Sequence, residues 1–335
     1  MIFFILKRIL LLFPTILGIS ILVFSMFYFI PGDPAQIMLG ERASAEAVAE
    51  LREELALDEP FHLQFIHFSY NLVSGDLGRS LRTHEKVSVE IFKRLPATIE
   101  LTIFSMLIAT SLGVIFGVFA AVHRGKYTDL MSMIISTAGI SLPIFWLALL
   151  LILVFSIYLP IFPVSGRTSP YTEIVPVTNF YIVDAILMNN PRGLQDVIRH
   201  LILPAFALGT IPMAFIARMM RASMIEIFHE DFIRTAWAKG LLSRTVVFRH
   251  ALRNAFIPTV TIIALEFGYL LGGAIITETI FSWPGIGRWL FLSVQARDLQ
   301  AVQGGVILIA TIFVIINTFA DILYAWLDPR IRYID

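Results

Sequence analysis

Chemistry in this chain would have to come from carboxylates, histidines or hydroxyl groups, because its 335 residues include no cysteine. That absence excludes disulfides, thiolate metal ligands and a cysteine nucleophile. The seven histidines are scattered along the chain, and His62 and His67 are five residues apart, which places them on different faces of a helix. No histidine cluster has the spacing of metal ligands, so we expect no metal site.

Two signatures of catalysis are also missing. The serines do not form the G-x-S-x-G pattern of a nucleophile elbow. The phosphate-binding pattern G-x-x-x-x-G-K-[ST] is absent, because Gly125 and Lys126 are followed by Tyr127 and lack the first glycine. We therefore expect a chain that is not an enzyme and carries no cofactor; any ATP and Mg²⁺ would be bound by another subunit.

The carboxylates that stand out are those inside apolar runs: Glu266, Glu278 and Asp321. A charge at bilayer depth is unfavourable unless it faces a cavity or a partner, so each is a functional candidate. Glu266 is the best candidate for lining a pathway or pairing with a second subunit, and a structural hydrogen bond is an equal alternative. Glu278 and Asp321 lie nearer the ends of their runs, which favours interfacial or structural roles.

These carboxylates would be positioned by membrane-spanning helices. The chain is 57% hydrophobic and 15% charged, against about 25% charged residues in a soluble domain, and its mean hydropathy is +0.81. Because about 20 helical residues cross a bilayer, we expect an all-α polytopic membrane protein with six transmembrane helices. The expected spans are Ile9–Ile30, Leu101–Val122, Leu130–Leu159 (long enough to tilt), Leu201–Ala217, Phe256–Ile280 and Leu299–Ala320.

Charge placement predicts the orientation. Thirteen lysines and arginines lie before the first span, in the turn after the second, in the loop after the fourth and beyond the last. The other face holds twelve, but most lie in long loops, to which the positive-inside rule gives little weight. The rule makes the face with thirteen cytoplasmic, so both termini are predicted to be cytoplasmic. The first apolar run is too long for a cleavable signal peptide. The net charge of zero gives no bulk electrostatic reason to expect nucleic acid as a partner.

The longest basic passage, Glu230–Pro258, lies between two apolar runs. It must be in water at the cytoplasmic face. Its core, Arg234-Thr235-Ala236-Trp237-Ala238-Lys239-Gly240, resembles the EAA loop of importer permeases of the ATP-binding-cassette (ABC) class. Arg234 and Thr235 stand where the general motif has Glu and Ala, and the distance from Gly240 to Pro258 is longer than usual. Both departures resemble the peptide-transporter branch.

Further motifs in the same order along nearly the whole chain resemble that branch. They are Pro31-Gly32-Asp33-Pro34, Gly75-Asp76-Leu77-Gly78-Arg79-Ser80, Arg94–Leu101, Arg218–Met224, Glu278–Gly287 and Asp328–Tyr333. The chain is therefore identified as similar to permease subunits of the dipeptide, oligopeptide and nickel importer family, and most similar to its dipeptide branch.

The resemblance implies the type I ABC importer permease fold. Residues 1–32 would hold the first span, residues 33–97 a small helical extracytoplasmic segment, and residues 98–335 the core. The core would include an outer insert at 160–199 and a cytoplasmic coupling loop at 218–255. Within the outer segment, Ser44 can cap one helix and Pro60 can begin another.

The resemblance also implies the function, a permease subunit of an ATP-driven importer of di- or oligopeptides in the bacterial inner membrane. Its partners would be a second permease, two ATPase subunits, an extracytoplasmic substrate-binding protein and membrane lipid. ATPase coupling would fall to Asp231, Arg234, Thr235, Ala236, Ala238, Lys239 and Gly240. Ala236 and Gly240 are four residues apart, so on a helix they share one face.

Alternatives remain open at this point. The same family could import glutathione, a nickel complex, haem or an antimicrobial peptide. A secondary transporter working alone would need an intramembrane relay, for which Glu266 is the only strong candidate. An integral membrane enzyme would need clustered His or Asp, which the sequence lacks. The basic helix could also be an ordinary cytosolic helix that caps the bundle.

Cysteine labelling tests the predicted orientation, since the chain has no cysteine of its own. Cysteine introduced at Ser44 or Thr172 should react with an impermeant maleimide added to intact cells, and cysteine at Ser243 should react only after permeabilisation. Labelling at Ser243 in intact cells would overturn the orientation.

Overall fold

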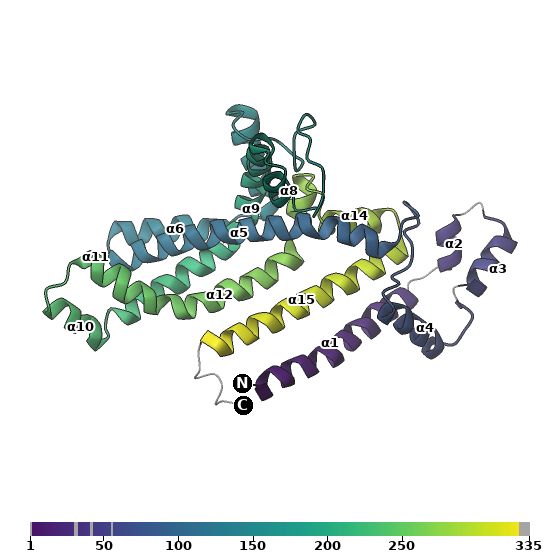
Figure 1. Ribbon diagram of the computed structural model, residues 1–335, viewed down its shortest axis with the longest axis horizontal. Coiled ribbons are helices and arrows are strands. Elements are labelled where there is room, and N and C mark those ends of the chain that lie inside the picture. The colour runs from purple at the N-terminus through teal and green to yellow at the C-terminus, as the bar shows by residue number, and fades with distance from the viewer. Residues whose placement is uncertain (1, 30–32, 41–42, 55, 328–335) are drawn as a thin grey trace.

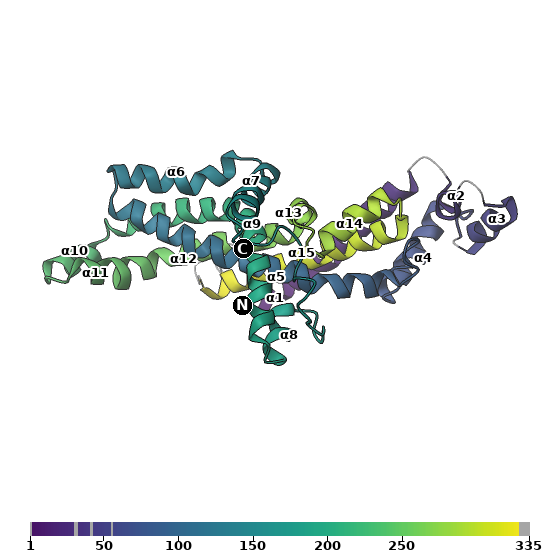
Figure 2. The same ribbon diagram turned by 90° about the horizontal axis from the view of Figure 1, so that it is seen from above.

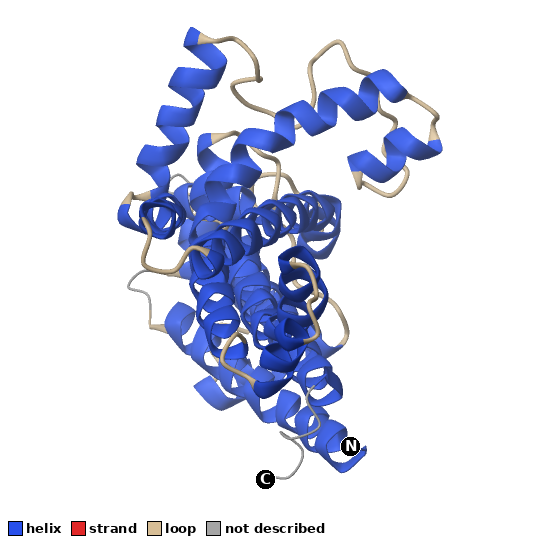
Figure 3. Cartoon of the chain, turned by 90° about the vertical axis from the view of Figure 1, so that its left-hand side faces the viewer, coloured by secondary structure: helices blue, strands red, loops and turns tan. Residues whose placement is uncertain are grey.

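The computed structural model describes residues 2–29, 33–40, 43–54 and 56–327. Over these residues the chain consists of helices joined by turns, with a single isolated antiparallel bridge between Arg79 and Lys86 (Figure 3). The expected all-α class is confirmed. The terminal motif at 328–335, the Pro31–Gly32 pair and the side chain of Asp321 lie outside the described residues.

Among the residues that the structure describes, four helices are long and apolar enough to cross a membrane. They are α1 (Ile2–Tyr28), α5 (Val87–Val122), α9 (Pro191–Ile227) and α15 (Leu299–Leu327). Each contains or largely overlaps one of the expected spans, the first, second, fourth and sixth. The fifth expected span, Phe256–Ile280, falls on α12 (Leu252–Gly273) and α13 (Ile275–Ile280), which are not among the four. The total of six spans stays a prediction.

The third expected span is not one tilted helix. It is divided into α6 (Tyr127–Ser141) and α7 (Ile144–Ile152), which continues into η1 (Leu153–Tyr158), and the two parts are bent by 104°. The break falls at Pro143, which has no N–H to donate and restricts Leu142 to an extended conformation (φ −103°, ψ 134°). Counting the bent pair as one span gives up to five spans.

The centre of the fold is the pair α5 and α9, which run close together along the long axis (Figure 1). Small residues allow the approach: a Cβ added at Gly117 would lie 2.6 Å from Met220 Cβ, and one at Gly209 would lie 2.7 Å from the Ser105 carbonyl oxygen. In lipid, helices associate through such close packing rather than through the hydrophobic effect. The helices α6 and α12 pack on this pair, and α15 packs on α12 and α1.

Short helices occupy the two ends of the molecule. The helices α10 (Asp231–Ala238) and α11 (Ser243–Thr245) lie at one end, followed by η2 (Val246–Ala251). The helices α2 (Pro34–Leu39) and α3 (Ala45–Glu54) lie at the other, as Figures 1 and 2 both show. The expected basic loop and the expected outer segment are therefore at opposite ends.

The outer segment packs on the end of α1. Ser44 Oγ accepts a hydrogen bond from Ala47 N at 3.2 Å, which confirms Ser44 as the cap of α3. The helix α4 (Phe61–Val73) begins directly after Pro60, as expected, and its phenylalanines surround Phe24 at ring distances of 5.3 to 5.5 Å. The range expected for this segment, 33–97, includes the first three turns of α5, which begins at Val87.

Two further features stabilise the outer segment. Arg52 donates to Asp33 Oδ2 at 2.8 Å, and this hydrogen bond holds the pKa of Asp33 below its usual value. Ser80 Oγ donates to Asp298 Oδ2 at 2.6 Å, which joins the turn before α5 to the turn before α15.

The outer insert at 160–199 is docked on the core. It contains α8 (Tyr181–Leu187), and its last residues already belong to α9. Buried Arg167 donates to Glu100 Oε2 of α5 through Nε at 3.2 Å, and Ile182 N donates to Glu100 Oε1 at 2.8 Å. The Gly166 N–H donates to the Phe281 carbonyl at 2.9 Å. These bonds hold the base of the insert against α5 and the segment that follows α12.

The close approach of α5 and α9 predicts opposite effects for two Gly→Ala substitutions. Gly117→Ala should destabilise the protein by about 1 to 3 kcal/mol, because the new methyl group overlaps Met220. Gly18→Ala, on α1, meets no atom within 4 Å and should be neutral or stabilising by up to about 1 kcal/mol. Thermal unfolding of the purified protein in one detergent measures both. Equal midpoints for the two variants would contradict the packing argument.

Candidate functional site

The predicted coupling residues lie on or just after α10, with Ile233 and Ala236 facing inward. Ala236 is 6% exposed and Ile233 is 1% exposed. Both belong to an apolar cluster of this chain's own residues that includes Met220, Met224, Val246, Ala251 and Ala255. Ala236 and Gly240 therefore do not form the shared exposed face that was expected, because the side of α10 that carries Ala236 packs against the rest of the chain.

Gly240 ends the helix. Its φ is +74°, a left-handed conformation that glycine adopts without strain. Gly240 N donates to the Trp237 carbonyl at 2.9 Å, and Leu241 N donates to the Ala236 carbonyl at 3.3 Å. This pair of bonds is a Schellman motif. A Cβ at Gly240 would meet no atom within 4 Å, so the glycine is required by backbone conformation rather than by space.

The outward face of α10 is apolar and basic. Arg234, Thr235, Ala238 and Lys239 are exposed, and Arg234 pairs with exposed Asp231 at 3.3 Å. Three large apolar side chains are exposed beside them: Phe232 at 42%, Trp237 at 45% and Leu242 at 77%. These three side chains were not predicted from the sequence, although a tryptophan between the charged residues of a water-exposed helix indicates a contact surface. A surface of this kind is suited to contact with another protein.

The end of α9, which leads to α10, is fixed to the first turn of α6 by a bidentate ion pair. Arg221, near the end of α9, donates to Asp129 Oδ1 through Nε and to Oδ2 through Nη2, both at 2.8 Å. Gly125 N, in the turn before α6, donates to Asp129 Oδ2 at 3.0 Å. A planar guanidinium that engages both carboxylate oxygens fixes orientation as well as distance. The start of α6 and the end of α9, which leads to α10, are therefore held together.

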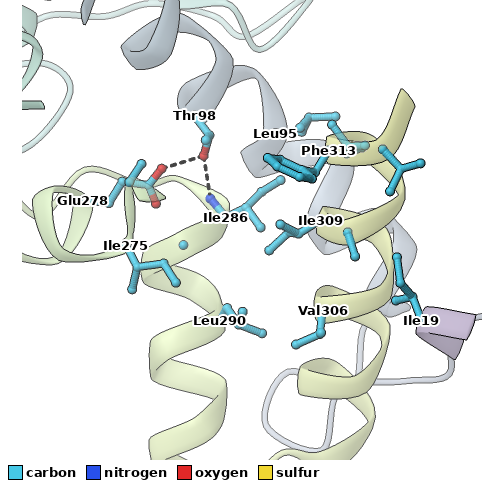
Figure 4. A pocket seen from close by; sticks show the side chains of 15 residues that line it. Ile19, Leu95, Thr98, Ile275, Glu278, Ile286, Leu290, Val306, Ile309 and Phe313 are labelled. Carbon is cyan, nitrogen blue, oxygen red and sulfur yellow. Dashed lines mark hydrogen bonds between the residues drawn. The ribbon is translucent and has the colours of Figure 1, made fainter. Parts of the chain in front are cut away.

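Glu278 lies far from α10, in α13 (Ile275–Ile280), and is fully buried. Thr98 Oγ1 donates to Glu278 Oε1 at 2.6 Å (Figure 4), and Arg288 N donates to Oε2 at 2.9 Å. Thr98 Oγ1 in turn accepts from Ile286 N at 2.9 Å. Glu278 and Thr98 thus satisfy N–H groups in the first turn of α14 (Ile286–Gln295).

The glycines next to this carboxylate make room for it. A Cβ at Gly285 would lie 2.1 Å from Glu278 Oε1, and one at Gly287 would lie 3.1 Å from Oε2. Trp283 Nε1 donates to the Ala97 carbonyl at 2.8 Å, which fixes the same turn to α5. The motif at 278–287 therefore forms a joint between α13, α14 and α5. These contacts agree with the structural alternative for Glu278.

A cavity of about 270 Å³ lies beside this joint. Figure 4 shows side chains from α1, α5, α13, α14 and α15 around it, mostly aliphatic. Glu278 is at its edge, and both carboxylate oxygens already accept hydrogen bonds from the protein. The cavity therefore presents an apolar wall and no free charge from Glu278.

Glu266 has a different environment. It is half-buried on α12, and in the described part of the chain no hydrogen bond or ion pair to its side chain is found. The two predicted intramembrane carboxylates thus differ in their hydrogen bonds. Glu278 accepts hydrogen bonds from protein groups, and Glu266 accepts none among the described residues. No group of three His, Asp or Glu residues suited to a metal ion occurs among the residues described.

Comparison with known proteins identifies the family. The model for binding-protein-dependent transport system inner membrane components matches residues 113–333, and the model for the N-terminal part of such membrane components matches residues 1–102. The chain belongs to this family. The resemblance found in the sequence motifs is confirmed, and with it a multi-pass inner membrane component.

Curated relatives of this inner membrane component match it over almost their full length. The dipeptide transport system permease protein DppB of Alkalihalophilus pseudofirmus is 48% identical over 327 residues, covering 98% of each chain. The protein of that name from Escherichia coli K12 is 46% identical over 334 residues, again covering 98% of each chain. The glutathione transport system permease protein GsiC of Escherichia coli O6:H1 is 41% identical over 330 residues, covering 98% of this chain and 99% of its own.

The joint at Glu278 predicts graded losses of stability. Glu278→Leu removes both acceptors and should destabilise the protein by at least about 2 kcal/mol, since an unpaired buried polar group costs about 1 to 3 kcal/mol. Glu278→Gln keeps one acceptor and should cost less. Glu266→Gln breaks no described hydrogen bond and serves as the control, with little change in the unfolding midpoint. An equal unfolding temperature for Glu278→Leu and the control would contradict the stabilising role of Glu278 in this joint.

Proposed function

We propose that this chain is the permease subunit of an ATP-driven ABC importer of di- and oligopeptides. Family membership and the names of the full-length relatives support a transport subunit. The observation that carries the coupling role is the outward face of α10, where exposed Phe232, Trp237 and Leu242 lie beside Arg234 and Lys239. That face is suited to an apolar groove with an acidic rim on an ATPase subunit.

In this proposal the chain crosses the membrane six times, with both termini in the cytoplasm. It pairs with a second permease to form one pathway, two ATPase subunits bind ATP and Mg²⁺, and an extracytoplasmic binding protein delivers the solute. The proposed spans add α12 and the bent pair α6–η1 to the four long helices.

Coupling would follow from the way α10 is held. The outward residues would bind the ATPase, while the inward residues Ile233 and Ala236 anchor the helix to this chain's core. Closure of the ATPases would move α10, and the Asp129–Arg221 pair would transmit the movement to α6 and α9. A helix of this kind couples only if its contacts differ between the two states of the transporter.

Import of glutathione is the second candidate, because GsiC is 41% identical to this chain. Uptake of a radiolabelled dipeptide into proteoliposomes containing the whole importer, with glutathione as competitor, decides between the two solutes. A stand-alone secondary transporter would show uptake without ATP and without ATPase subunits.

Tryptophan substitutions test the coupling face. Ala238→Trp places a large side chain on the exposed surface of α10, where it should lower ATPase co-purification and ATP-dependent uptake by about tenfold or more without changing the unfolding midpoint. Ala236→Trp should instead lower the midpoint, because Ala236 lies in the apolar cluster.

The matched control for these variants is Ala45→Trp, on exposed α3 at the opposite end of the molecule. It should leave ATPase co-purification unchanged. Normal co-purification and uptake in Ala238→Trp would show that α10 is not the coupling element, while family membership would stand.

A further inference from the structure

A second cavity, of about 280 Å³, lies at the basic end of the molecule, between α5 and the segment that follows α10. Val118, Phe119 and Val122 line it from the last turns of α5, and Val247 and Phe248 line it from η2. Phe119 is 55% exposed and Phe248 is 56% exposed. The walls are therefore apolar and open to the surroundings.

The rim of this cavity is polar and carries positive charge. It is formed by His123, Ser243 and Arg244, and none of the residues that line the cavity is acidic. Arg244 is exposed, and within the described residues no carboxylate lies within ion-pair distance of it. The His123 ring stacks on Phe119, with 6.3 Å between ring centroids, and its Nδ1 is 3.0 Å from the Phe119 carbonyl oxygen. The imidazole is thus held at the rim.

The position of the cavity relates it to the membrane. Val122 is the last residue of α5, a helix apolar enough to span a bilayer, so the cavity lies where that span ends. At this depth the hydrocarbon of a bilayer meets its phosphate groups. A protein docked from the water phase would cover Ser243 and Arg244, but it would have to enter the hydrocarbon to reach Val118 and Phe119.

We propose that this cavity binds one anionic phospholipid. An acyl chain lies between Phe119 and Phe248, and the phosphate is bound by Arg244 and His123. Guanidinium groups favour phosphate because they can donate two parallel hydrogen bonds to it, and basic pockets at the ends of spans bind acidic headgroups. The site goes beyond the proposed transport role and requires no particular solute.

The bound lipid would connect two parts of the chain that are close but not bonded at this point. His123 follows α5, and Arg244 lies on α11, four residues after Gly240. A phosphate held by both would brace the segment that carries α10 against the end of α5. The lipid would therefore stiffen the basic end of the molecule.

Native mass spectrometry of the intact importer in detergent tests the proposal. The complex is titrated with dioleoyl-phosphatidylglycerol or, separately, with dioleoyl-phosphatidylcholine. The wild-type complex should retain the anionic lipid in preference. Arg244→Ala should weaken phosphatidylglycerol binding about fivefold and remove the preference, as expected for the loss of one basic contact worth about 1 kcal/mol.

Two variants distinguish the site from general attraction of anionic lipid to basic protein. Arg253→Ala removes the same charge from an exposed position on α12 at the same end, outside the cavity, and should leave the preference unchanged. Val122→Trp fills the cavity without changing charge and should weaken binding of both lipids. The proposal is overturned if Arg244→Ala keeps the preference, if Arg253→Ala loses it equally, or if the wild-type permease binds the anionic lipid only when the ATPase subunits are absent.

Discussion

The close packing of α5 against α9 is the constraint on which the rest of the structure depends. A membrane helix pair gains no hydrophobic free energy from leaving lipid, so it must gain van der Waals contact by bringing the two backbones together. The glycines at Gly113, Gly117 and Gly209 allow this, since a Cβ at any of them would lie within 3.0 Å of a neighbouring atom. The helices α6 and α12 are then positioned by a pair that cannot slide without steric overlap.

Both ends of the molecule are attached to this pair by buried or half-buried polar contacts. At the outer end, α5 provides Glu100 for Arg167 of the insert and Thr98 for Glu278. At the basic end, the first turn of α6 and the end of α9 meet through Asp129 and Arg221. A rotation of α5 would disturb contacts at both ends together. This arrangement favours rigid-body movement of the bundle over local rearrangement.

The residues that cap helices were predictable from the sequence, but the face of α10 that is buried was not. Ser44 and Pro60 have the expected capping and starting positions, because a cap depends on a few neighbouring residues. The inward direction of Ala236 depends instead on residues of α9 and η2, which periodicity within α10 cannot reveal. The break at Pro143 was not predicted, because the length and apolarity of the run Leu130–Leu159 also fit one long tilted helix. The partner of Glu278, Thr98, is 180 residues away in sequence, so proximity had to come from the fold.

The buried and half-buried carboxylates differ in whether groups of this chain donate hydrogen bonds to them. Glu90 accepts from Trp289 Nε1 at 2.8 Å, Glu100 accepts from Arg167, and Glu278 accepts from Thr98 and Arg288. Such groups stabilise joints between helices, and each is satisfied without a second subunit. Glu266 differs, because it is half-buried within an otherwise apolar stretch of α12 and has no hydrogen-bond partner among the described residues. A carboxylate in that position is unfavourable in lipid. Glu266 therefore remains the residue on α12 that we predict to meet water in a pathway or a donor from a second permease.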